Sequence, residues 1–183
     1  MPRAFGFVAF AIMLVAPCLT HAQEKPVKVE EQKSFSVIGL AVRTNNKAEA
    51  TGQGEIPKLW QRFMDQGVAD KIPNRAEQSL VVVYTDYESD EKGEYTYLIG
   101  SRVTTSSDVP VGLTLKEVPA GKYAVFESEK GAAPAVVPKL WQQIWVMSAQ
   151  DLGGQRAFLA DYEAYPPGYD PRNVQITLHI GLK

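Results

Sequence analysis

Residues 56–61 read IPKLWQ and residues 137–142 read VPKLWQ, so five of six positions are identical at a separation of 81 positions. A second match, Ile-Gly at 99–100 and again at 180–181, has the same separation. The tripeptide DYE also occurs twice in the same order, at 86–88 and at 161–163. Matches that recur in order at a fixed separation are typical of internal repeats, so we predict a duplicated unit.

Each half of the chain predicts a strand, a helix and two further strands. Both PKLW stretches begin a helix, because proline is tolerated in the first helical turn and the following apolar residues lie at helical spacing. Short apolar or alternating runs predict strands at residues 35–43, 79–85, 95–103, 113–118, 122–127, 156–165 and 174–182. We therefore predict an α+β fold of two half-units, about 35–104 and 111–183, related by pseudo-twofold symmetry. The antiparallel sheet has its helices on one side and a central ligand crevice between the halves.

The N-terminus predicts export. Arg3 precedes an apolar run at residues 5–15, and the sequence Thr-His-Ala at 20–22 fits a cleavage site, so residues 1–22 read as a signal peptide. A lipoprotein signal ending at Cys18 is the alternative, but proline immediately before the cysteine fits it poorly. Residues 23–34 are charged and predict a flexible arm, and residues 35–183 predict a single domain in the periplasm or the medium.

Composition argues against several function classes. The formal net charge is −2 at pH 7, and one unit more negative without Arg3, so we expect no nucleic-acid partner. No second apolar run reaches membrane length, so we expect no membrane contact after signal cleavage. The acidic turn at 86–90 lacks the glycine and glutamate of an EF-hand, and His179 is the one histidine left after cleavage. We therefore expect no metal and no cofactor, and His179 reads as an ordinary strand residue.

Glu163 is the centre of the candidate site. Strand alternation places it on the same face as Asp161, with Tyr162 on the other face. Its alternative role is an exposed strand residue, or one paired with Arg156. We expect Trp60 in the core, whereas of Trp141 and Trp145 we expect one in the core and one partly lining a pocket. Glu88 is expected to be a solvated carboxylate at a hairpin end.

Several stretches carry a family resemblance: FSVIGLAVRTN at 35–45, then IPKLWQRF, VYTDYESD, GEYTYLIG, VPAGKYAVFE and DYEAY. Together they resemble the GyrI-like effector-binding domains, which also occur on AraC-type and MerR-type regulators, and in particular their stand-alone, integron-associated subset. The resemblance covers residues 35–183. It implies a pocket at the seam between the halves, where many members bind amphipathic cations with aromatic walls and a buried glutamate. The family's Glu-x-Tyr motif matches Glu163 and Tyr165.

We therefore expect an exported binding protein that captures a small, amphipathic, cationic organic molecule. A carboxylate in an apolar crevice attracts a delocalised cation, and aromatic faces add cation–π attraction. The predicted ligand-binding residues are Glu163, Tyr165, Trp145, Tyr123, Tyr87 and Trp141. The alternative is a hydrolase of electrophilic small molecules in which Glu163 activates water and Tyr165 donates a proton. A third reading, a module for protein partners or self-association, has no specific support, and the oligomeric state is not predicted.

Overall fold

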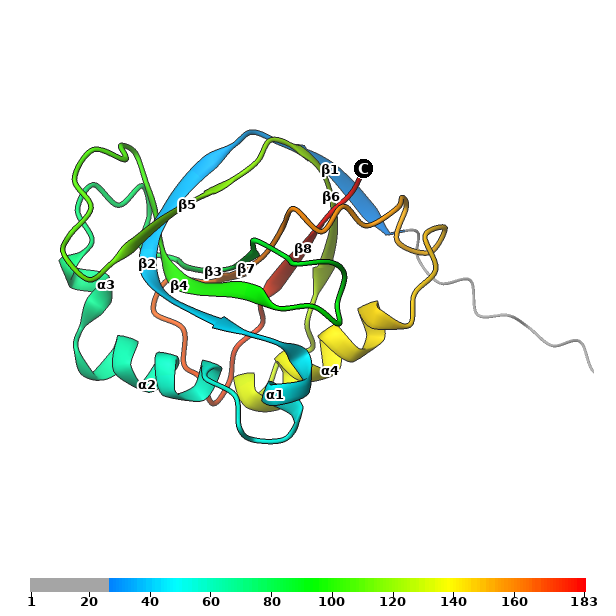
Figure 1. The fold of residues 1–183 in the computed structure, drawn as a ribbon, viewed down its shortest axis with the longest axis horizontal. Coiled ribbons are helices and arrows are strands. Elements are labelled where there is room, and N and C mark those ends of the chain that lie inside the picture. Colours follow the sequence, from blue (N-terminus) through cyan, green and yellow to red (C-terminus); the bar gives the residue numbers. More distant parts are fainter. Residues whose placement is uncertain (1–26) are drawn as a thin grey trace, which may run out of the picture.

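The computed structural model describes residues 27–183, and the expected signal peptide at 1–22 lies outside these residues (Figure 1). The elements are, in chain order, β1 (Lys28–Gln32), β2 (Phe35–Thr44), α1 (Asn46–Ala50), α2 (Ile56–Asp65), α3 (Val68–Lys71), β3 (Leu80–Thr85), β4 (Tyr95–Val103), β5 (Thr114–Val118), β6 (Gly121–Glu127), α4 (Ala133–Trp145), β7 (Ala160–Tyr165) and β8 (Thr177–Gly181).

The described strands form one eight-stranded antiparallel sheet in the order β1-β6-β8-β7-β3-β4-β2-β5. Strands β3 and β7 form the centre of the sheet. On one side β3 is followed by β4 and β2, and on the other side β7 is followed by β8 and β6, so the two halves have the same strand order. Helices α2 and α4 both lie on one side of this sheet (Figure 1). The prediction of an α+β fold with an antiparallel sheet is therefore confirmed.

The central ladder follows the spacing of the sequence matches. Val82 of β3 pairs with Glu163 of β7, and these residues are 81 positions apart, like the two PKLW stretches. The DYE match does not follow this spacing: residues 86–88 lie in the turn after β3, whereas residues 161–163 lie within β7. Reading the two DYE tripeptides as equivalent was therefore wrong, because they are 75 rather than 81 positions apart. Duplication of the chain remains our inference from the sequence.

The outer strands of the sheet bend into a two-stranded ribbon that covers the central strands on the face opposite the helices. The β1–β6 pair and the β2–β5 pair have the same register. Gln32 pairs with Gly121, and three residues further on Phe35 pairs with Val118. Figure 1 shows these four strands as an arch. The expected flexible arm is wrong for Lys28–Gln32, which form β1. Backbone hydrogen bonding to β6 stabilises this polar strand, and composition does not reveal such bonding.

Alternation along the central strands creates two cores. In β3, Val82 and Tyr84 face the helices, whereas Val81 and Val83 face the ribbon. Every residue of β3 is buried, as expected for a continuous apolar run in a central strand. The polar hydroxyl of Tyr84 therefore lies among apolar side chains on the helix side, where it needs a hydrogen-bond partner.

Two boundaries differ clearly from the sequence expectation. Helix α4 spans Ala133–Trp145, so Pro138 lies inside the helix rather than in its first turn. Strand β7 begins at Ala160, because the chain before it turns through Phe158, which has a φ of 53°. The short helices α1 and α3 were not predicted, since single-turn helices leave no periodic apolar pattern.

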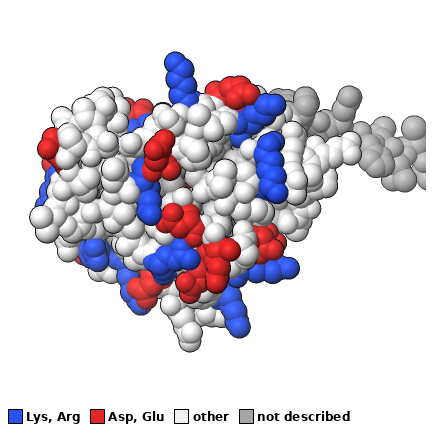
Figure 2. All heavy atoms as spheres, turned by 45° about the horizontal axis from the view of Figure 1, so that its top comes forward, with Lys and Arg blue, Asp and Glu red and all other residues white. Residues whose placement is uncertain are grey.

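The face in Figure 2 shows acidic and basic side chains interspersed rather than gathered by sign. None of the helices in residues 27–183 has both the length and the apolar character needed to cross a membrane.

Replacing Gly39 by alanine is expected to destabilise the fold strongly. Gly39 of β2 pairs with Gly100 of β4, and a Cβ on Gly39 would lie 2.0 Å from the carbonyl oxygen of Ile99. Backbone atoms cannot rotate away, so we expect the free energy of unfolding to fall by about 3 kcal/mol or more in urea denaturation. The control Gly52→Ala, with a φ of 73° and no atom within 4 Å of its Cβ, should cost only about 1 kcal/mol. Equal stability of the two variants would contradict this account.

Candidate functional site

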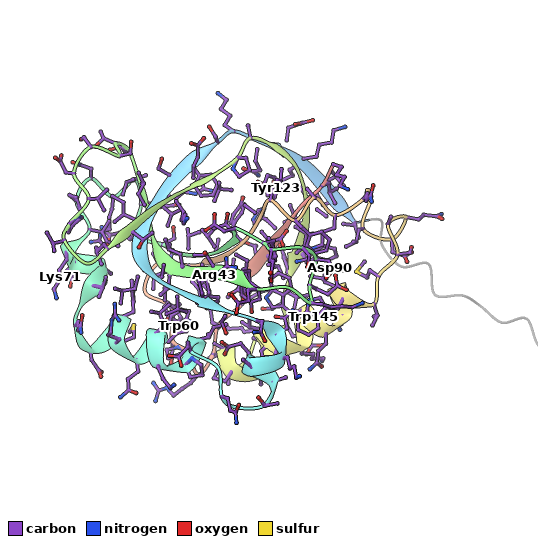
Figure 3. All side chains as sticks on the ribbon, viewed as in Figure 1. Arg43, Trp60, Lys71, Asp90, Tyr123 and Trp145 are labelled. Atoms are coloured by element: carbon purple, nitrogen blue, oxygen red, sulfur yellow. The ribbon has the colours of Figure 1, made fainter. Side chains whose placement is uncertain are left out.

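A cavity of about 600 Å³ lies between helices α2 and α4 and the central strands. Its walls are mostly aromatic, and Figure 3 shows Trp60 on α2 and Trp145 on α4 on this side of the sheet. The aromatic lining residues are Trp60, Tyr84, Tyr87, Tyr95, Tyr97, Trp141, Trp145, Tyr165 and Tyr169. The cavity lies on the helix side of the sheet, between the two helices that contain the PKLW stretches.

Glu163 lies directly behind this aromatic wall and is 0 % exposed. One carboxylate oxygen, Oε1, accepts hydrogen bonds from the Tyr84 hydroxyl at 2.6 Å and from the Trp141 indole N–H at 2.8 Å. The other, Oε2, accepts from the Tyr165 hydroxyl at 2.8 Å. Burial raises the pKa of Glu163, although the three hydrogen bonds act in the opposite direction. The rings that line the cavity therefore carry the donors that hold the carboxylate.

A second buried carboxylate, Asp161, lies on the same face of β7, as alternation predicted. Its Oδ2 accepts from the Tyr87 hydroxyl at 2.6 Å and pairs with the Arg156 guanidinium at 2.6 Å, and its Oδ1 accepts from the Gly181 N–H at 2.8 Å. Arg156 thus pairs with Asp161 and not with Glu163. Of these two carboxylates, Glu163 is the one without a basic partner among residues 27–183.

Four predicted ring residues line the cavity: Tyr87, Trp141, Trp145 and Tyr165. Tyr123, which was also predicted to bind the ligand, does not line it. It lies on the ribbon side of the sheet (Figure 3), where its hydroxyl donates to the Pro119 carbonyl at 2.9 Å. The reason is alternation along β6, which turns Ala124 toward the helices and Tyr123 away from them.

Trp60 was expected in the core and instead lines the cavity. Its indole N–H donates to the Tyr97 hydroxyl at 2.7 Å, and its ring packs edge-on against Tyr165 at 5.3 Å between centroids. The 81-position spacing makes Trp60 the counterpart of Trp141, so the repeat contained a signal for this role. Trp141 is almost fully buried while lining the cavity, and Trp145 is 42 % exposed at its edge.

Sequence reasoning missed the tyrosines of β3 and β4. Tyr84 is 81 positions before Tyr165, and both hydroxyls donate to Glu163. Tyr95 and Tyr97 alternate along β4 and line the same wall. The repeat spacing would have identified Tyr84. The sequence predicted β4 as a strand, but its alternation does not show which of its two faces lines a cavity.

The remaining candidates lie elsewhere. Glu88 is exposed in the β3–β4 turn, as expected. His179 lies on the ribbon side, stacked on Tyr162 at 4.2 Å between centroids, and burial lowers its pKa to about 4, so it is neutral near pH 7. Among residues 27–183, no group of three or more His, Cys, Asp or Glu side chains is arranged to hold a metal ion.

The fold and the cavity together are those of an effector-binding domain. The family described as "Cass2: Integron-associated effector binding protein" matches residues 28–182, and the chain belongs to this family. The resemblance drawn from the sequence motifs is therefore confirmed.

Relatives and solved structures agree with this assignment. The protein YobU of Bacillus subtilis (strain 168) is 29% identical over 147 residues, which cover 79% of this chain and 90% of YobU. The transcriptional regulator BrlR of Pseudomonas aeruginosa is 29% identical over 159 residues, which cover 85% of this chain but only 54% of BrlR. An integron cassette protein from the mobile metagenome of Vibrio cholerae superposes with a TM-score of 0.70 at 27% identity, covering 87% of this chain and 97% of that one.

The protein SAV2435, solved with tetraphenylphosphonium bound, has the same fold. It superposes with a TM-score of 0.69 at 20% identity, covering 86% of this chain and 93% of SAV2435.

Replacing Glu163 by glutamine is expected to change the pH dependence of stability. A folded-state pKa raised by burial makes the wild type lose stability as the pH rises through that pKa, and the glutamine variant has no such titration. The free energy of unfolding of the variant should therefore rise relative to the wild type as the pH increases from the unfolded glutamate value, about 4.3, through the raised folded-state pKa, by about 1.4 kcal/mol for each unit of pKa shift. Urea denaturation across this range measures the difference. The control Glu88→Gln removes an exposed carboxylate and should follow the wild type, and a pH-independent difference for Glu163→Gln would contradict the assignment.

Proposed function

We propose that this protein binds an amphipathic organic cation in the aromatic cavity in front of Glu163. The observation that carries the proposal is a fully buried carboxylate with three neutral donors and no basic partner in the described part of the chain. Burying an ionised group without an opposite charge is costly, so a ligand cation close to this wall offsets that cost. A charge about 8 Å away contributes on the order of 2 kcal/mol at an effective dielectric constant of about 20.

The aromatic rings supply the second component of affinity. Trp60, Trp141 and the surrounding tyrosines present faces to the cavity, and each favourable cation–π contact contributes about 0.5–2 kcal/mol. A volume of about 600 Å³ lies within the usual range for small-molecule pockets. The site is therefore large enough for a polycyclic or multiply substituted cation.

Arg156 provides an example within the chain of a cation held by aromatic rings and a buried carboxylate. The Arg156 guanidinium lies 4.4 Å from the Phe158 ring centroid and 5.5 Å from that of Trp141, while it pairs with Asp161. A cation held between aromatic faces and a buried carboxylate is thus already a stable arrangement beside the cavity. Tetraphenylphosphonium in SAV2435, which shares the fold, supports a cationic ligand here.

Binding fits the geometry better than hydrolysis. Both oxygens of Glu163 accept hydrogen bonds, and its side chain is not exposed to the cavity, so water has no direct access to it. A general base must reach the water that it activates. The carboxylate is positioned to act through its charge.

We also propose that the protein acts after export. The support is the charged start, the apolar run and the small-residue site within residues 1–22. A cavity for amphipathic cations in the cell envelope would sequester such molecules outside the cytoplasm.

Tetraphenylphosphonium is expected to bind, whereas tetraphenylborate, an anion of matched size and shape, is not. Quenching of tryptophan fluorescence measures both, since Trp60, Trp141 and Trp145 line the cavity. Glu163→Gln should weaken cation binding about tenfold or more, because it removes the uncompensated charge and keeps the side-chain shape. Glu88→Gln, an identical change at an exposed position outside the cavity, should leave the affinity unchanged.

The same titration repeated at lower pH provides an internal check. Because burial raises the pKa of Glu163, its charge is lost at a higher pH than that of an ordinary glutamate. Cation affinity of the wild type should fall as the pH drops through that pKa, and that of Glu163→Gln should stay flat. Equal binding of the borate and phosphonium ions would overturn the proposal.

Export is tested by expressing the full chain in a Gram-negative host and determining the N-terminus of the fractionated protein by mass spectrometry. We expect a periplasmic form that begins at Gln23. Leu14→Arg, which interrupts the apolar run, should leave the uncleaved chain in the cytoplasm. A mature chain beginning at lipid-modified Cys18 would favour the lipoprotein alternative, and an uncleaved cytoplasmic wild type would contradict export.

A further inference from the structure

Two carboxylates line the cavity itself, in addition to Glu163, which lies behind the cavity wall. Glu49 comes from α1 and Glu91 from the β3–β4 turn, and both are partly exposed. Neither forms an ion pair with a basic residue in residues 27–183. Arg156 is the one basic residue that lines the cavity, and Asp161 already neutralises it. The lining therefore carries more negative charge than one ligand cation would compensate.

These two carboxylates belong to one edge of the cavity. The Asn46 side-chain amide donates to the Glu91 carbonyl at 2.8 Å, and Glu49 follows Asn46 by three positions on the same short helix. Residues three positions apart lie on one face of a helix. Asn46 also lines the cavity, so it connects the segments that carry the two carboxylates.

A continuous row of tyrosines joins this edge to Glu163. The Tyr95 hydroxyl donates to Asn46 Oδ1 at 3.0 Å, and the Tyr95 and Tyr84 rings are 5.5 Å apart between centroids. The Tyr84 hydroxyl in turn donates to Glu163. Burial raises the pKa of the Tyr95 phenol, and the charges of Glu49 and Glu163 raise it further, so both carboxylates act on this one hydroxyl.

We propose that the preferred ligand carries two cationic centres, one against the ring wall in front of Glu163 and one at the edge formed by Glu49 and Glu91. This inference rests on the proposed cation-binding function and specifies its ligand class. The tyrosine row between the two charges accommodates an apolar spacer, so the ligand is an elongated organic dication. A single compact cation at the ring wall leaves the Glu91 carboxylate without a partner.

The Glu49 and Glu91 carboxylates differ in their contacts with the rest of the chain. Glu49 Oε1 accepts hydrogen bonds from the N–H groups of Glu55 and Ile56 at the start of α2, so removing its charge would also disturb the fold. The Glu91 carboxylate makes no hydrogen bond or ion pair within residues 27–183, which leaves it available to a ligand. Glu91 is therefore the position to test.

The test compares dications with matched monocations. Isothermal titration calorimetry measures hexamethonium and decamethonium against hexyltrimethylammonium and decyltrimethylammonium, which differ only by the second cationic headgroup. We expect at least one dication to bind the wild type several-fold more tightly than its matched monocation. Glu91→Gln should reduce that ratio about threefold, since a partly exposed ion pair contributes modestly. Glu88→Gln, three residues earlier and outside the cavity, should leave the ratio unchanged.

Salt gives a second readout. The advantage of the dication should shrink at high ionic strength, because the edge is open to solvent, whereas the buried Glu163 is screened much less. If neither dication exceeds its monocation, or if Glu91→Gln leaves the ratio unchanged, the dication inference is overturned while cation binding stands. If tetraphenylphosphonium and the monocations also fail to bind, the proposed function itself is wrong.

Discussion

The hydrogen bonds to the Glu163 carboxylate unite the sheet, one helix and the cavity wall. Tyr84 belongs to β3, Tyr165 to β7 and Trp141 to α4, so three elements from both halves of the chain converge on one side chain. Each of these buried donors would otherwise lack a partner on the apolar helix side of the sheet. Glu163 thereby fixes the orientation of the rings that line the cavity, and the fold and the shape of the cavity depend on the same three contacts.

The position of Glu163 explains why a single carboxylate accepts hydrogen bonds from both halves of the chain. It pairs with Val82 across the central ladder, where the 81-position spacing maps one residue onto the other. Around this point the rings occur in matched pairs, Trp60 with Trp141 and Tyr84 with Tyr165. A second carboxylate at Val82 would place two like charges in one buried site, which disfavours ionisation of both. A valine on one side and a glutamate on the other keep the charge and avoid that repulsion.

The sequence predicted those features that leave a periodic or repeated pattern. The PKLW spacing predicted both helices, and β-branched runs predicted β3 and β4, because burial selects those residue types. Alternation correctly placed Asp161 beside Glu163, and the same rule, applied to β6, would have excluded Tyr123 had the inward face of that strand been known. Strand β1 was not predicted, because it is stabilised by backbone pairing with β6, and side-chain composition contributes little to such pairing. Trp60 was assigned to the core because an apolar helix face packs in the same way against a core and against a cavity.

In the proposed function, the choice of donors determines which cations the cavity would select. A guanidinium in place of the tyrosine and indole donors would satisfy the oxygens of Glu163 but cancel its charge, as Arg156 does for Asp161. Neutral O–H and N–H donors satisfy the oxygens and leave the negative charge in place. A small hydrated ion gains little from this charge, since the aromatic faces in front of it cannot replace its water ligands. A large cation with dispersed charge is weakly hydrated and loses little on entry, so its shape and charge both match the wall. The proposed selectivity therefore follows from the separation of the carboxylate from the cavity by a layer of rings.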